Sequence, residues 1–145
     1  MSTADYQVFI PEVQSVCTAA NARLLLNADP QLAQELGAEG VHLNSERMLA
    51  CTGRPADFQW VGASCHSPAE VRHAGNIGVD FIVVSPVQPT RSHPGAATLG
   101  FEGLQALTEL ATVPVYALGG MSKADLDQVY RHGAQGIAAI GALWS

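Results

Sequence analysis

One pattern occurs three times in this chain and constrains its fold more than any other feature. A glycine is followed, two or three residues later, by an apolar run: Gly37 precedes residues 40–43, Gly78 precedes residues 80–85, and Gly133 precedes residues 136–140. Glycine readily adopts the left-handed conformation that ends a helix, and a short apolar run bounded by turn residues is typical of a buried strand. Repetition of this helix–turn–strand unit predicts stacked βαβ units.

Six runs in total have strand character. They comprise residues 23–27, 40–43, 60–64, 80–85, 113–118 and 136–140. Most of them are continuously apolar rather than alternating, which is typical of strands buried on both faces of a parallel sheet. We therefore expect six parallel strands.

Helical segments precede and separate these runs. A leading helix is expected near residues 8–21. Residues typical of helix N-termini, including two capping boxes, occur at Asp29 with Pro30, at Ser67 to Glu70, and at Ser122 to Asp125. A further helical face is formed by Phe101, Leu104, Leu107 and Leu110.

The alternation of strands and helices predicts an α/β fold of the TIM-type (β/α) barrel class. A closed barrel of this kind has eight strands, so we expect a partial barrel of about six βα units, equivalent to strands 3–8. The prediction is a single domain over residues 1–145, with the leading helix in residues 1–21 and the βα units in residues 22–145.

Charge and composition exclude several classes of partner. The net charge is −6 and the seven lysine and arginine residues are not clustered, which argues against a nucleic-acid or anionic membrane surface. No apolar run reaches membrane-spanning length, and the N-terminus does not resemble a signal peptide, so we expect a cytoplasmic protein. Cys17, Cys51 and Cys65 lack a CxxC spacing, which favours reduced thiols over a disulfide framework or a zinc site.

Glycines mark the ends of the last two strands, where the active site of a βα-barrel lies. Gly119 and Gly120 follow the fifth run, and Ile140 and Gly141 lie at the end of the sixth. Glycine at such a position allows backbone N–H groups to approach a phosphate. A glycine pair can also simply make a turn, but its occurrence at two adjacent strand ends favours a phosphate site.

The histidines divide into candidate and structural residues. His66 follows the third run, where it could act as an acid–base group near neutral pH or only hydrogen-bond the backbone at a helix start. His93 lies in the long polar loop after the fourth run, which could close over a ligand or remain a solvated loop. We expect His42 to be a satisfied interior histidine, and His73 and His132 to lie on helix surfaces.

Five consecutive segments together resemble thiamine phosphate synthase and its relative, the thiazole tautomerase. They are LLLNADPQLAQELGAEGVHLN, VGASCHSPAEV, GVDFIVVSPVQPTRSHPG, PVYALGGM and HGAQGIAAIGAL. The resemblance extends to the synthase-like domain that follows a Nudix hydrolase domain in some bacterial fusion proteins. This family joins a hydroxymethylpyrimidine diphosphate to a thiazole phosphate and releases pyrophosphate in the presence of Mg²⁺.

The resemblance implies roles for individual residues. It implies thiazole-phosphate binding by the two glycine-containing loops already described, and proton transfer by His66 as in the tautomerase. Asn27 falls on a position that contacts the pyrimidine, Thr90 falls on a position that contacts the diphosphate, and Ser64 matches a further site position. His93 stands where the family has a lysine that meets the diphosphate.

The metal site implied by the resemblance is altered. The first metal-binding aspartate of the family corresponds to Ala28 and the second to Arg47, although Glu46 is adjacent. Asp29 is one residue off and is expected to cap a helix. Because Mg²⁺ needs hard oxygen ligands, we expect no metal site here, and Mg²⁺ would be a cofactor only if synthase activity were retained.

Three functions remain open at this point. The chain could bind a thiazole phosphate or similar small phosphate, with His66 catalysing a proton shift. It could be a non-catalytic binding or regulatory module derived from a Nudix fusion. It could also be a synthase completed by a partner chain. Six strands leave two unpaired edges, so we expect self-association, or pairing with an N-terminal half or a Nudix domain, that covers residues 23–27.

Overall fold

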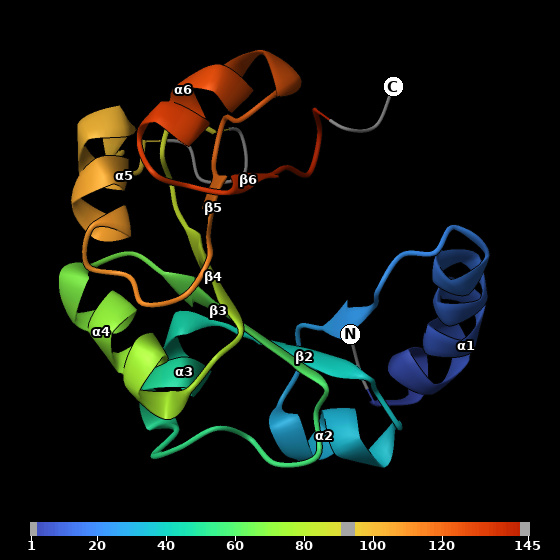
Figure 1. The fold of residues 1–145 in the computed structure, drawn as a ribbon. Coiled ribbons are helices and arrows are strands. Elements are labelled where there is room, and N and C mark those ends of the chain that lie inside the picture. The colour runs from blue at the N-terminus through green and yellow to red at the C-terminus, as the bar shows by residue number, and fades with distance from the viewer. Residues whose placement is uncertain (1–2, 91–94, 143–145) are drawn as a thin grey trace.

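The computed structural model describes residues 3–90 and 95–142, and it shows a curled sheet of six parallel strands (Figure 1). The strands are β1 (Leu25–Leu26), β2 (Gly40–Leu43), β3 (Trp60–Cys65), β4 (Phe81–Val84), β5 (Val115–Leu118) and β6 (Gly136–Ala138). Neighbouring strands in the sheet are also consecutive in the chain. The predicted partial (β/α) barrel is therefore confirmed, although β1, β4, β5 and β6 are shorter than the apolar runs that contain them.

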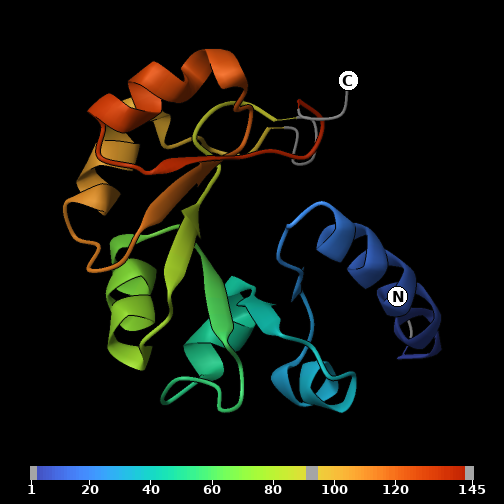
Figure 2. The same ribbon diagram turned by 45° about the vertical axis from the view of Figure 1, so that its right-hand side comes forward.

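The helices lie on the outer side of the curled sheet, with α1 beside β1 and α6 beside β6 (Figures 1 and 2). They are α1 (Thr3–Ala19), α2 (Pro30–Glu35), α3 (Ser45–Ala50), α4 (Pro68–Ile77), α5 (Gly100–Thr108), the 3-10 helix η1 (Lys123–Asp125) and α6 (Leu126–Arg131). In the described part of the chain, no helix is long and apolar enough to cross a membrane. Helix α3 was not predicted, because its one turn and a half buries only Met48 and leaves no periodic pattern.

The predicted helix ends are confirmed in detail. Gly37, Gly78 and Gly133 have φ angles of 66°, 79° and 86°, so each adopts the left-handed conformation expected before a strand. The Asp29 carboxylate caps α2 by accepting a hydrogen bond from the Gln31 N–H at 2.9 Å. These local signals depend only on neighbouring residues, which explains why the sequence reveals them.

The two faces of the sheet differ in burial. The outer face packs under the helices and forms the core, with Val41, Ala63 and Ile82 fully buried. The inner face carries half-buried side chains, among them Phe81 and Tyr116. The expectation that the strands are buried on both faces is therefore only half correct, because the described strands do not close into a complete barrel.

Candidate functional site

The candidate residues gather at the carboxyl-terminal edge of the sheet. Asn27 follows β1, Ser64 and His66 lie at the end of β3, Thr90 lies in the β4–α5 loop, Gly119 and Gly120 follow β5, and Ile140 and Gly141 follow β6. Parallel strands bring these positions to one side of the molecule, as the sequence predicts. His93 lies outside the described residues.

Gly119 and Gly120 both pack against the β4–α5 loop, but only Gly119 is buried. A Cβ atom at Gly120 would lie 2.6 Å from the carbonyl oxygen of Pro89. Gly119 is buried with a φ of 98°, and a Cβ atom there would lie 2.8 Å from Cα of Pro86. Its carbonyl oxygen also accepts a hydrogen bond from the Gln88 N–H at 3.0 Å. The turn interpretation therefore describes Gly119 well, because this glycine allows the β4–α5 loop to pack closely.

Exposed backbone donors remain on the two loops after β5 and β6. Gly120 and Gly141 are both exposed, and a Cβ atom at Gly141 would meet nothing within 4 Å. Within the described residues, the N–H groups of these two glycines donate to no backbone acceptor. Because β5 pairs with β6, the two loops are neighbours, and they can present N–H groups to one anion.

Hydrogen bonds to the Asp125 carboxylate stabilise the loop between β5 and α6. Asp125 accepts hydrogen bonds from the Ser122 hydroxyl at 2.8 Å and the Ser122 N–H at 2.9 Å, which completes the predicted capping box. Gln88 Nε2 donates to the same carboxylate at 3.2 Å and so connects the loops after β4 and β5. The hydrogen bonds from Ser122 lower the pKa of Asp125 and outweigh the effect of its partial burial.

His66 connects the ends of β3 and β4. Its Nδ1 lies 2.7 Å from the carbonyl oxygen of Ser85. A carbonyl oxygen can only accept a hydrogen bond, so Nδ1 carries a proton, and a neutral ring keeps the lone pair on Nε2. The side chain is exposed. Both interpretations of His66 therefore apply, since one nitrogen binds the backbone and the other remains available as a base.

Glu70 supports the turn that carries His66. Its carboxylate accepts hydrogen bonds from the His66 N–H at 2.5 Å and from the Ser45 hydroxyl. Partial burial alone raises the pKa of Glu70, but the bonds from Ser45 and His66 and the nearby His66 ring lower it overall. Burial, and then the charge of Glu70, raise the pKa of the adjacent Cys65 thiol to about 12, so this cysteine is no nucleophile at neutral pH.

The other histidines have structural partners. His42 Nε2 lies 2.9 Å from the Ser64 hydroxyl on the inner face, and burial lowers the pKa of His42, as suits an interior histidine. His73 is half-buried, with Nε2 3.0 Å from the carbonyl oxygen of Cys51 in the turn after α3. His132 is also half-buried and stacks on Phe101. The prediction that His73 and His132 lie on helix surfaces is therefore only partly correct, because both are half-buried against a neighbouring segment.

The residues after β1 and β2 do not fit a magnesium ion. Ala28 is 2% exposed and offers only a methyl group. Arg47 Nη1 donates to Asn27 Oδ1 at 3.1 Å, so the amide oxygen there already has a cationic partner. Within the described residues, no group of three or more His, Cys, Asp or Glu side chains is placed to hold a metal. The contact between Arg47 and Asn27 could not be inferred from the sequence, because 20 residues separate them.

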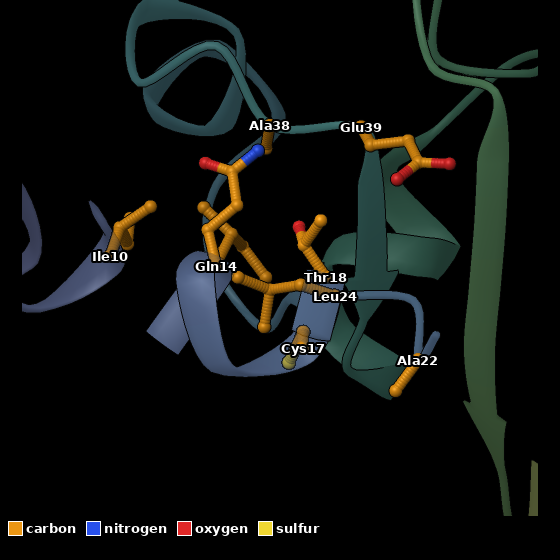
Figure 3. A pocket seen from close by; sticks show the side chains of 9 residues that line it. Ile10, Gln14, Cys17, Thr18, Ala22, Leu24, Ala38 and Glu39 are labelled. Atoms are coloured by element: carbon orange, nitrogen blue, oxygen red, sulfur yellow. The ribbon is translucent and has the colours of Figure 1, made fainter. Parts of the chain in front are cut away.

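Two pockets lie at the opposite, amino-terminal edge of the sheet. One lies between α1 and the segments that lead into β1 and β2, where Gln14, Cys17 and Glu39 line it (Figure 3). Its volume of about 40 Å³ is far below the roughly 300–1,000 Å³ that is usual for ligand sites. The other is lined by residues that precede β5 and β6, among them Thr112 and Gln135. Neither pocket includes a candidate residue.

The fold defines the class of protein, an α/β protein of the TIM-barrel type, and the candidate residues lie at the carboxyl ends of its strands. The model of the thiamine monophosphate synthase family matches residues 1–143. The chain belongs to this family, and the resemblance to thiamine phosphate synthase is confirmed. The resemblance to the domain of Nudix fusion proteins stays a prediction.

Named relatives support the same assignment. The Aquifex aeolicus protein named "Putative thiamine-phosphate synthase 2" is 35% identical over 130 residues, which cover 89% of this chain and 70% of the relative. The thiamine-phosphate synthase of Chloroflexus aurantiacus is 31% identical over 134 residues, which cover 91% of this chain and 62% of the relative. The chain thus spans only part of the length of these proteins.

Solved structures show the same fold. Thiamine phosphate pyrophosphorylase from Pyrococcus furiosus superimposes with a TM-score of 0.76 at 25% identity, over 97% of this chain and 67% of that chain. FabK from Thermotoga maritima superimposes with a TM-score of 0.71 at 15% identity, over 96% of this chain and 47% of that chain. The second likeness concerns the fold alone.

Proposed function

We propose that this chain binds a small phosphate monoester of the thiazole phosphate type at the carboxyl-terminal edge of the sheet, and that His66 moves a proton within the bound ligand. The observation that carries this proposal is the pair of exposed glycines, Gly120 and Gly141, on adjacent loops. Their N–H groups have no backbone acceptor in the described part of the chain. Such donors suit the oxygens of a phosphate.

His66 supplies the acid–base group of this proposal. Its Nε2 takes a proton from one atom of the ligand ring and returns it to another, so that the ring is isomerised and no group is transferred. The Ser85 carbonyl holds the Nδ1 proton throughout. The nearby Glu70 carboxylate stabilises the imidazolium that forms in between. This chemistry requires no metal ion, which agrees with the residues found after β1 and β2.

Titration calorimetry with thiazole phosphate, with and without Mg²⁺, tests binding. The Gly141→Asp variant places a carboxylate at the proposed phosphate position without a steric clash, so we expect at least a roughly tenfold loss of affinity from charge repulsion. Gly53→Asp is the matched control, since this glycine also has open space around it and lies in the α3–β3 loop. Absence of binding by the unmodified chain would refute the proposal.

A non-catalytic binding module is the second candidate. The alanine and arginine after β1 and β2 favour it over a synthase, because they supply no carboxylate for a metal. Binding of thiazole phosphate without any isomerisation identifies this case. Magnesium-dependent release of pyrophosphate, seen only with a partner chain present, identifies a synthase completed by that partner.

Self-association is also part of this proposal. Within the described residues, β1 and β6 each pair with a single strand, and the inner face is half-exposed. Helix α1, beside β1, also exposes Phe9 by 54% and Val16 by 69%. These two side chains are seven residues apart and share one helix face, which suits a contact with a second copy of the chain.

A further inference from the structure

Arg47 lies at the edge that carries the candidate site and forms no ion pair with a carboxylate of the described residues. The ion pairs within the described residues join Arg23 to Glu39 and Arg54 to Asp80, and Arg47 takes part in neither. The Arg47 side chain is half-buried. Partial burial of a charge without a counter-charge is unfavourable, so the environment of Arg47 favours an anion beside it.

Two asparagines bind Arg47, one through its guanidinium and one through its backbone. Asn27, after β1, accepts a hydrogen bond from Nη1 at 3.1 Å. Asn44, after β2, accepts one from the Arg47 backbone N–H at 2.9 Å. Backbone and side chain are thus each anchored at the end of a different strand. A guanidinium has five N–H donors, and Asn27 accepts from only one of them.

We propose that Arg47 binds an oxyanion of a phosphorylated ligand directly, in place of a metal ion. A planar guanidinium offers two parallel N–H donors to a phosphate and keeps its charge at all physiological pH values. Asn27 is then a positioning residue, since it holds the guanidinium and does not bind the anion itself. The inference rests on the proposed function for the edge at which the ligand binds, but it assigns a second anion-binding group, which follows β2 rather than β5 and β6.

The residues around Arg47 do not fit Mg²⁺, which also supports direct binding of the anion by Arg47. A divalent cation near Asn27 would meet the like charge of Arg47, and the methyl group of Ala28 provides no oxygen ligand. The oxyanion is therefore neutralised by the chain itself. Binding at this group is expected to be independent of Mg²⁺.

Calorimetry of the full chain with inorganic pyrophosphate, in a buffer containing EDTA, tests the inference. The titration uses the Gly141→Asp background, in which we expect the loops after β5 and β6 to bind an anion more weakly. We expect residual pyrophosphate binding that weakens roughly tenfold or more in Arg47→Gln and less in Arg47→Lys, which keeps the charge. Arg72→Gln is the control, because Arg72 is exposed on α4, and its affinity should not change.

Together with the titration of thiazole phosphate into the unmodified chain, this experiment separates the inference from the proposed function. If thiazole phosphate does not bind but pyrophosphate binding still depends on Arg47, the proposed function is refuted. The assignment of Arg47 as an anion-binding residue is then still supported. Equal affinity for pyrophosphate in Arg47→Gln, a requirement for Mg²⁺, or no pyrophosphate binding would overturn the inference. If Arg47→Gln does not fold, the comparison with Arg47→Lys decides, since an unchanged affinity there contradicts a bidentate contact.

Discussion

Nδ1 of His66 lies 2.7 Å from the carbonyl oxygen of Ser85, so the ring after β3 is held by the backbone that leaves β4. This contact defines the tautomer of the neutral ring, with the proton on Nδ1 and the lone pair on Nε2. It also joins two neighbouring loops at the edge where all described candidate residues lie. The chemistry proposed for the chain depends on this arrangement.

Replacement of His66 separates catalysis from binding. We expect His66→Ala to bind thiazole phosphate with unchanged affinity, because the glycine amides are retained. Exchange of the ligand ring proton in D₂O, followed by NMR, should slow by about 10²-fold or more, as is usual when a general base is lost. His132→Ala is the control, since this histidine stacks on Phe101 before β6. Undiminished exchange in His66→Ala would show that another group is the base.

Gly119 is predicted to be essential for folding. Alanine at this position would adopt an unfavourable φ of 98°, and its Cβ atom would lie 2.8 Å from Cα of Pro86. We expect Gly119→Ala to lower the free energy of unfolding by about 2–4 kcal/mol, from the left-handed backbone and from overpacking. In urea titrations the control Gly53→Ala, which meets nothing within 4 Å, should change little. Equal stabilities for the two variants would contradict this assignment.

Asp80 connects the α3–β3 loop to the sheet. Its Oδ2 accepts hydrogen bonds from Arg54 Nη2 and from the Val61 N–H, both at 2.7 Å. Asp80→Ala leaves these two donors without their acceptor, so we expect a loss of about 2 kcal/mol in the free energy of unfolding. The Arg23–Glu39 pair is more exposed, at 53% and 38%, and Glu39→Ala should cost less than about 1 kcal/mol. Chemical denaturation that ranks the two variants in the reverse order would refute this.

The hydrogen bonds to Asp125 make the stability of the folded chain depend on pH. Hydrogen bonds from Ser122 lower the pKa of Asp125 below its ordinary 3.8. A lowered folded-state pKa stabilises the protein above the ordinary value, and this stabilisation is lost as the pH falls through the folded pKa. We expect Asp125→Asn to lower the urea midpoint at pH 7, by an amount that shrinks below pH 3.8. Asp127→Asn, on the exposed side of α6, is the control. If the difference in urea midpoint between Asp125→Asn and the unmodified chain does not change with pH, the role of the Asp125 carboxylate is contradicted.

Association of the chain is expected to involve α1. Sedimentation should detect species heavier than the 15.2 kDa chain. Phe9→Lys combined with Val16→Lys should reduce this association, because charges replace exposed apolar side chains. Leu49→Lys is the control, since Leu49 is 50% exposed on α3. A monomer at all concentrations would refute the proposed self-association.

Predictions from the sequence succeeded where the signal was local. The apolar runs and the stops at Gly37, Gly78 and Gly133 predicted the strands and their order. The caps at Asp29 and Ser122 were also correct. Helix α3 was missed, since it has too few residues for a periodic signal. His73 and His132 were placed on the surface, because their partners Cys51 and Phe101 are distant in the chain.

The resemblance of five sequence segments indicated the family. The sequence by itself also determined the six strands and the edge at which the candidate residues lie, because periodicity, capping and turn residues act between near neighbours. Only the tertiary structure decided which side chains meet there. The contact of Arg47 with Asn27 and that of His66 with Ser85 join segments 20 and 19 residues apart. Such contacts arise from the curvature and register of the sheet, and no local pattern encodes them.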